Sequence, residues 1–201
     1  MNMLPRLRRL TVLAACCATA FPQVIEFESS GLKYQTLTKK GVTIMFTPTA
    51  AHVRNYSMLQ VAVSNGSGMY WTIRPEDFSF SRDGQSITAE PAHQVITLLL
   101  DKGSQNDVVK LVTAYESALY GIAHMRLTNG YLQRRQAALS EGVSTRFKAA
   151  AAASALALVA TRLPPGQSTD GAIFFPTDRK LLAGGRLIVH TGTETFEFNP
   201  E

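Results

Sequence analysis

The chain has 201 residues, an apolar fraction of 45% and a formal charge of +5 at pH 7. This length is enough for a sizeable core in one domain with an elaboration, and the apolar fraction is ordinary for a globular protein. Three of the positive charges, Arg6, Arg8 and Arg9, lie at the very start, and without them the formal charge falls from +5 to +2. A basic surface for nucleic acid is therefore not indicated.

Residues 1–15 have the pattern of a secretory signal peptide. The three arginines precede a short apolar stretch, Leu10-Thr11-Val12-Leu13-Ala14-Ala15, which ends in small residues. Leu13-Ala14-Ala15-Cys16 resembles the lipobox of bacterial lipoproteins. The resemblance implies cleavage before Cys16, a diacylglycerol thioether on its sulfur and a further acyl chain such as palmitate on its new amino group. Several acyl chains at one terminus give a lasting membrane anchor.

Two other interpretations of this segment stay open. Cleavage can follow Ala18-Thr19-Ala20, or the segment can remain as an anchor, although its apolar run is far shorter than the ~20 residues that span a bilayer. We expect residues 16–40 to form a lipidated N-terminus and tether. The protein should then lie in the cell envelope, facing the periplasm or the outside. Cys17 stands where an Asp commonly signals inner-membrane retention, so the outer membrane is favoured where the cell has one.

Strand patterns begin after the tether, at residues 42–46 and 58–64. Both runs are rich in β-branched and aromatic residues, and the second ends in the turn formers Asn65-Gly66-Ser67-Gly68. Residues 70–73 follow, and then Phe78 and Phe80 alternate with serines before a hairpin turn at Asp83-Gly84. No cysteine lies beyond Cys17, so the domain has no disulfide, Cys-based zinc site or thiol nucleophile.

The pattern changes to helices over residues 101–160. The first predicted helix places Val108, Leu111, Val112 and Tyr115 at helical spacing, a second covers residues 127–139, and an alanine-rich third contains residues 149–153. Strands resume at residues 171–176, 186–190 and 194–198. This order predicts a mainly β protein, a β-sandwich over residues 41–201 that carries a helical insertion between strands. An α+β domain with helices on one face of a single sheet is the alternative.

Short motifs on both sides of the insertion resemble immunoglobulin-like domains of exported bacterial proteins, of the type catalogued as DUF4352. They are Val61-Ala62-Val63-Ser64-Asn65, Asp77-Phe78-Ser79-Phe80, Leu163-Pro164-Pro165-Gly166 and Gly171-Ala172-Ile173-Phe174. The resemblance implies an immunoglobulin-like β-sandwich and an exported location, and it implies no catalytic residues.

The sequence has no signature of a catalytic, cofactor or metal site. The histidines at 52, 93, 124 and 190 are not spaced as ligand pairs, and Ser67 lies in a predicted turn rather than a nucleophile elbow. Trp71 with Tyr70 fits either a core tryptophan or an aromatic platform for a ligand. We therefore predict no catalytic residue, no metal and no cofactor.

The function that these observations favour is a non-enzymatic, membrane-tethered binding or structural module of the bacterial cell envelope. Its recognition element would be the helical insertion, with Tyr131, Arg134 and Arg135 as candidate contacts to an envelope protein, because Tyr and Arg are enriched at binding hot spots. The alternative is an envelope hydrolase whose scattered Ser, His and Asp residues are brought together by the fold.

Overall fold

The computed structural model describes residues 23–119, 131–138, 144–178, 180, 182, 184–192 and 194–199. The predicted signal peptide and Cys16 lie outside the described residues, as do Cys17 and His124.

The first of two packed sheets has five antiparallel strands in the order β1-β2-β3-β4-β9. The first four strands are consecutive in the chain and form a meander, while the fifth comes from beyond the helical insertion. Their bounds are Ile25–Ser29, Leu32–Lys39, Val42–Val53, Tyr56–Asn65 and Ser168–Pro176. β3 and β4 contain the two runs from which the sequence predicts strands, and both are largely buried.

The second sheet has four antiparallel strands in the order β11-β10-β6-β7. The bounds of β6, β7, β10 and β11 are Phe78–Arg82, Gln85–Thr88, Arg186–Thr191 and Glu194–Phe198. The predicted hairpin turn joins β6 to β7, with Asp83 and Gly84 at φ 52° and 77°, as this turn requires. A short 3-10 helix, η1 (Pro75–Asp77), precedes β6.

The two sheets face each other across one apolar core, so the predicted β-sandwich is confirmed. Alternate residues of each strand point inward, which follows from the two-residue period of a strand. Fully buried rings fill the space from both sides, among them Phe78, Phe175, Phe196 and Phe198. The meander differs from the immunoglobulin order, in which the third strand already belongs to the opposite sheet.

The helices lie between β7 and β8 in the chain, as predicted, but the insertion begins earlier than residue 101. α1 spans Ala92–Lys102 and is followed by α2 (Gln105–Leu119), α3 (Tyr131–Ala138) and α4 (Thr145–Leu156). The sequence hides α1 because Pro91 at its N-cap offers no capping side chain. Its apolar run also reads equally well as a buried strand.

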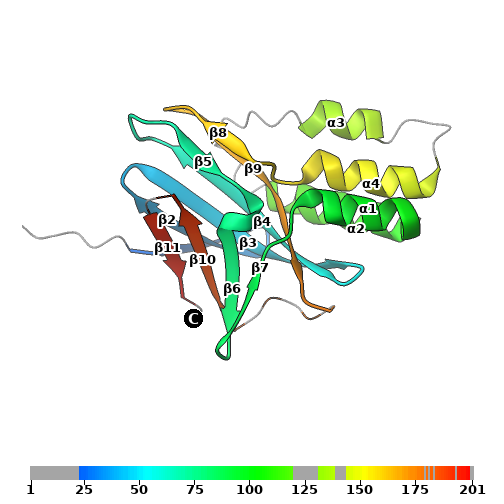
Figure 1. Ribbon diagram of the computed structural model, residues 1–201, viewed down its shortest axis with the longest axis horizontal. Helices are drawn as coiled ribbons and strands as arrows, with labels where there is room; N and C mark the ends of the chain where they lie inside the picture. The colour runs from blue at the N-terminus through cyan, green and yellow to red at the C-terminus, as the bar shows by residue number, and fades with distance from the viewer. Residues whose placement is uncertain are drawn as a thin grey trace, which may run out of the picture.

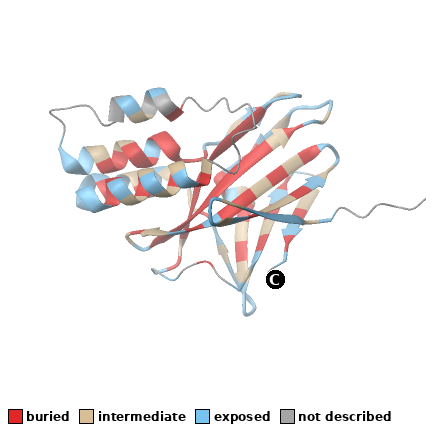
Figure 2. Ribbon diagram, turned by 180° about the vertical axis from the view of Figure 1, so that it is seen from behind, coloured by how far each residue is buried: buried red, intermediate tan, exposed pale blue. Residues whose placement is uncertain are grey.

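The helices cover the face of the five-stranded sheet that points away from the second sheet (Figure 1). Under the helices, β4 and β9 are almost entirely buried, as the red stretches of the sheet show in Figure 2, whereas most of β1 at the far edge is exposed. Met58 and Phe174 of the sheet pack in one cluster with Leu111 and Tyr115 of α2 and the alanines of α4. Small side chains let α4 lie close to its neighbours. None of the described helices is long and apolar enough to cross a membrane.

Candidate functional site

Of the residues predicted as a partner surface on the second helix, Tyr131 is buried and Arg135 is partly exposed in an ion pair. Tyr131 of α3 is only 5% exposed, and its ring lies 4.3 Å, centroid to centroid, from the buried ring of Tyr115. Arg135 Nε lies 2.6 Å from Glu116 Oε1, a carboxylate that also accepts a hydrogen bond of 3.1 Å from the Tyr131 hydroxyl. The backbone of Arg134 belongs to α3, and its side chain lies outside the described residues.

Tyr131 is thus a core residue, and its prediction as a partner contact is corrected. Burial, together with the neighbouring carboxylate of Glu116, raises the pKa of the Tyr131 phenol. The phenol therefore stays neutral and serves as a hydrogen-bond donor between α3 and α2. Sequence reasoning could not foresee this, because an eight-residue helix with little apolar periodicity does not reveal which face is covered.

A buried polar cluster lies beneath α2 on the outer face of the five-stranded sheet. Asp170 Oδ2 accepts hydrogen bonds from the Tyr115 hydroxyl at 2.5 Å and from Gln60 Nε2 at 2.9 Å. All three residues are at most 2% exposed. This carboxylate is buried away from solvent, so the cluster joins helix to sheet and offers no access to a ligand.

Among the described residues, the most exposed aromatic side chain is that of Tyr70, which lies at the other end of the sandwich, just before a two-stranded ribbon. We call β5 (Trp71–Ile73) and β8 (Thr161–Leu163) the ribbon, in which Thr72 pairs with Arg162. Asn65, at the end of β4, is fully buried and organises the turn that leads into it. Its Nδ2 donates to the carbonyl oxygens of Met69 at 2.7 Å and Leu163 at 3.0 Å.

Ser67 links Asn65 to Trp71 through two hydrogen bonds. The Ser67 hydroxyl donates to Asn65 Oδ1 at 2.6 Å and accepts from Trp71 Nε1 at 3.0 Å. The indole ring is partly buried and packs against the sandwich core. Trp71 therefore belongs to the edge of the core and also forms part of the surface next to it. Ser67 lies in a bend, as predicted, and its hydroxyl serves the turn.

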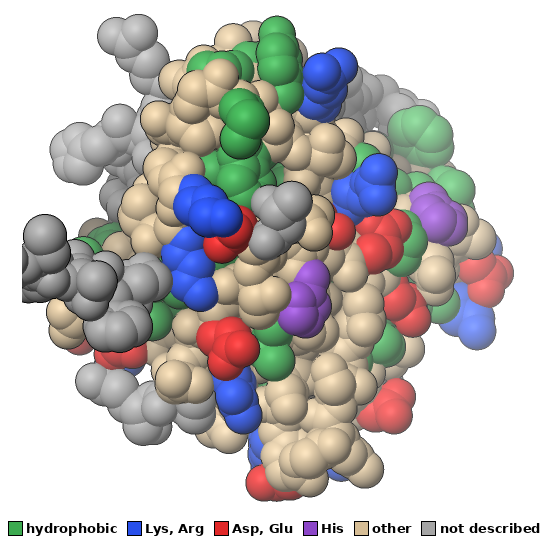
Figure 3. All heavy atoms as spheres, turned by 60° about the vertical axis from the view of Figure 1, so that its left-hand side comes forward, with side chains coloured by type: hydrophobic (Ala, Val, Ile, Leu, Met, Phe, Trp, Pro, Cys, Tyr) green, Lys and Arg blue, Asp and Glu red, His purple; other side chains and the backbone are tan. Residues whose placement is uncertain are grey.

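Two side chains next to Trp71 project into solvent. Met69 is 70% exposed and Tyr70 is 59% exposed. The guanidinium carbon of Arg162 lies 4.4 Å from the centroid of the Tyr70 ring, a cation–π distance. Figure 3 brings this end forward and shows hydrophobic side chains gathered in its upper part with Lys or Arg side chains beside them. Exposed Tyr, Met and Arg together are typical of binding surfaces.

A hollow of about 380 Å³ opens beside these side chains. Its walls come from the ribbon, from η1 and from the turn between β10 and β11, and they consist of Met69, Tyr70, Trp71, Thr72, Arg74, Asp77, Thr191 and Gly192. Asp77 Oδ2 accepts the backbone N–H of Arg74 at 2.8 Å, which fixes the wall at η1. Burial raises the pKa of the Asp77 carboxyl, although that hydrogen bond and the Arg74 charge oppose the rise.

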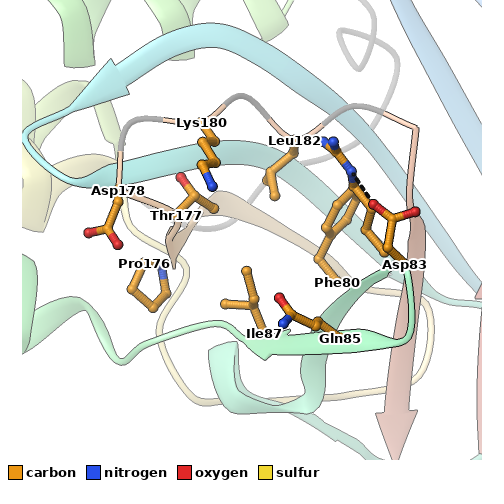
Figure 4. Close-up of a pocket in the computed structure, with 10 residues that line it drawn as sticks. Phe80, Asp83, Gln85, Ile87, Pro176, Thr177, Asp178, Lys180 and Leu182 are labelled. Atoms are coloured by element: carbon orange, nitrogen blue, oxygen red, sulfur yellow. Dashed lines mark hydrogen bonds and ion pairs between the residues drawn. The ribbon is translucent and has the colours of Figure 1, made fainter.

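A second cavity of about 310 Å³ lies between the β6–β7 hairpin and the segment after β9 (Figure 4). Ile87 and Leu182 point toward one another across it. At its rim, Arg82 Nε and Asp83 Oδ2 form an exposed ion pair of 3.2 Å. Exposed charge pairs of this kind contribute little, and no exposed aromatic group lines the cavity. The ribbon and its hollow are therefore the better candidate.

The histidines do not join a catalytic arrangement in the described part of the chain. His190 Nδ1 lies 3.0 Å from Thr195 Oγ1. Within that part, no histidine hydrogen-bonds to a serine or a carboxylate, and His, Cys, Asp and Glu side chains nowhere gather in threes where they could hold a metal ion.

Sequence reasoning found part of the ribbon site. Tyr70 and Trp71 stand out as a candidate platform from their composition alone. Arg162 does not, because it lies about ninety positions further along the chain and reaches Tyr70 only through the pairing of β5 with β8. The Gly-rich turn before Tyr70 was the one local signal of an exposed loop.

No family model, curated protein or solved structure matches this chain. The resemblances to lipoproteins and to DUF4352-type domains therefore stay predictions.

Proposed function

We propose that this protein is a non-enzymatic, membrane-tethered binding module of the bacterial cell envelope, and that the ribbon end of the sandwich is its binding surface. The observation that carries the proposal is the group of Met69, Tyr70 and Arg162, exposed beside a hollow and held in place by the buried Asn65. A rigidly anchored turn that presents apolar and aromatic side chains to water lowers the entropy lost on binding.

The binding surface can be tested by site-specific photo-cross-linking in intact cells. A photoreactive amino acid would replace Tyr70 in one strain and Phe147 in another. Phe147 is a matched control because it is also an exposed aromatic residue, 51% exposed, but lies on α4 in the helical layer. We expect discrete adducts from position 70 and none from position 147. Equal adducts at both positions, or none at 70, would contradict the proposal.

The tether rests on the lipobox resemblance and needs its own test. Cys16→Ser should leave an unprocessed precursor or release the protein from membranes, because the acceptor of the thioether is lost. Cys17→Ser is the matched control and should be processed and anchored like the wild type. Membrane fractionation and the electrophoretic shift of the precursor give the readout. A Cys16→Ser protein that is processed and membrane-bound as before would exclude the lipid anchor.

A further inference from the structure

We infer that the ribbon site binds an acidic segment of a partner protein, with Arg162 holding a carboxylate and the hollow taking an apolar side chain next to it. This inference rests on the proposed function and specifies the chemistry of the partner.

Arg162 is prepared to bind a carboxylate. Its guanidinium carbon lies 4.4 Å from the centroid of the Tyr70 ring, and its side chain is exposed. A guanidinium offers N–H donors in a planar fork that matches a carboxylate bidentately. Among the described residues, the ion pairs of the arginines involve Arg54, Arg82, Arg135 and Arg186, and none involves Arg162.

The charge around the hollow has the sign that an acidic segment needs. Arg74, the residue after β5, is exposed in the wall of the hollow, and Arg162 lies against Tyr70, another residue of that wall. The one carboxylate in the wall, Asp77, is already bound to the backbone of Arg74. Two arginines at the hollow, and a carboxylate already bound to the backbone, favour an anionic ligand and disfavour a basic one.

The hollow favours a protein segment over a flat lipid surface. It has a volume of about 380 Å³, which a projecting side chain can fill and a planar membrane cannot. Met69 on its rim is flexible and polarizable, and such side chains adapt to apolar partners of varied shape. Carboxylate and apolar side chain must then be close neighbours in the partner, as in a segment that alternates Asp or Glu with aromatic or aliphatic residues.

A displayed library of random twelve-residue peptides tests this, with the full-length protein purified in detergent as the bait. We expect the selected peptides to be enriched in Asp and Glu next to aromatic or aliphatic residues. Arg162→Gln should weaken their binding by about tenfold or more, because the charge-assisted hydrogen bonds of the guanidinium to the carboxylate are lost. Arg162→Lys, which keeps the charge and loses the planar fork, should lie in between. Arg146→Gln, an exposed arginine next to α1 and Gly103, is the control and should bind like the wild type.

Other outcomes would overturn the inference. No selected peptides, peptides without acidic enrichment, or binding that survives Arg162→Gln would each do so. The inference also fails if Tyr70 and Arg162 are needed to bind vesicles that contain anionic phospholipid while no peptide binds. Peptides that need Tyr70 but not Arg162 would remove the acidic partner and leave the proposed binding surface intact. Without any selected peptide, and without adducts at position 70 in cells, the proposed function falls as well.

Discussion

The two faces of the five-stranded sheet are buried in different ways. The inner face meets the second sheet through bulky rings, such as the edge-to-face pairs of Phe46 with Phe198 and of Phe80 with Phe175. The outer face meets α2 through side chains such as Leu111 and Tyr115, and the alanines of α4 belong to the same cluster. At its centre lie a buried carboxylate, an amide and a phenol, those of Asp170, Gln60 and Tyr115.

The difference shows that one sheet can pack through apolar rings alone on one face and include buried hydrogen-bonded polar groups on the other. Large rings on facing sheets fill a gap of about 10 Å. On the outer face the ring of Tyr115 spans from α2 to the sheet, and its hydroxyl donates to the carboxylate of Asp170 at 2.5 Å. Such a polar cluster stabilises one arrangement of the helices only if its groups find partners.

The largest effect should come from emptying either apolar core. Phe78→Ala on the inner side and Phe174→Ala on the outer side should each lower the free energy of unfolding by about 3–5 kcal/mol, because the rings are 0% and 1% exposed. Chemical denaturation gives the measurement. A loss below about 1 kcal/mol at Phe174 alone would mean that the helices do not cover the sheet as described.

A smaller loss of stability is expected from a substitution at Gly171 of β9, where the segment between α4 and β8 passes close to the strand. A β-carbon on Gly171 would lie 2.4 Å from the backbone nitrogen of Leu158 and 2.5 Å from its Cα, and backbone cannot turn aside as a side chain can. Gly171→Ala should therefore destabilise by about 1–3 kcal/mol. Gly68→Ala is the control, because its β-carbon would meet nothing within 4 Å. Equal stability of the two variants would show that the approach is looser than described.

The hydrogen bond between Tyr56 and Glu90 should make the stability of the protein depend on pH above pH 10. The Tyr56 hydroxyl donates to Glu90 Oε2 at 2.5 Å, and burial, followed by this carboxylate, raises the pKa of Tyr56 to about 12 from 10.0. A raised pKa means that the neutral phenol stabilises the fold below pH 10, and that this contribution is lost as the pH rises through about 12. Stability of Tyr56→Phe should fall less over that interval than stability of the wild type.

Denaturation at several pH values gives that comparison. Tyr70→Phe is the control, because its ring is 59% exposed, and it should follow the wild type. If Tyr56→Phe also follows the wild type, the link from Tyr56 to Glu90 contributes nothing to the pH dependence.

The smallest effect should come from the partly exposed ion pair of Arg135 with Glu116. Arg135→Glu sets two carboxylates side by side and should destabilise by about 0.5–1 kcal/mol, since the two side chains are 37% and 40% exposed. Arg186→Glu breaks the more exposed pair with Glu197 in the sandwich and should cost about half as much or less. Thermal unfolding of both variants ranks them, and a larger loss for Arg186→Glu would reverse the comparison.

Much of the sandwich could be predicted from the sequence, because its signals are local. Alternating apolar residues and the Asp83-Gly84 turn determine β6 and β7 within a few residues of one another. The pairing of β4 with β9 and of β5 with β8 joins positions about a hundred residues apart, and no short pattern encodes it. The candidate site is therefore the part least predictable from the sequence, because Arg162 reaches it only through the pairing of β5 with β8. The burial of Tyr131 could not be predicted either, because it arises only when α3 packs on its neighbours.

The helical layer is also less separable than the sequence suggests. The motifs on both sides of it appear complete alone and predict that the insertion is dispensable for the sandwich. In the structure its removal would expose Met58 and Phe174, each 1% exposed, and would open the buried Asp170 to water. A deletion variant therefore needs polar substitutions on the outer face before its folding says anything about the helices.

The segments that lead into and out of the helical layer both hydrogen-bond to the same edge of β9. The N–H of Glu90 donates to the carbonyl of Phe174, and the N–H of Leu158 donates to the carbonyl of Ala172, each at 2.8 Å. Departure and return thus lie two residues apart on one strand. One strand of the sandwich therefore fixes both ends of the helical layer, and the length of chain between these ends does not change where the layer begins and ends.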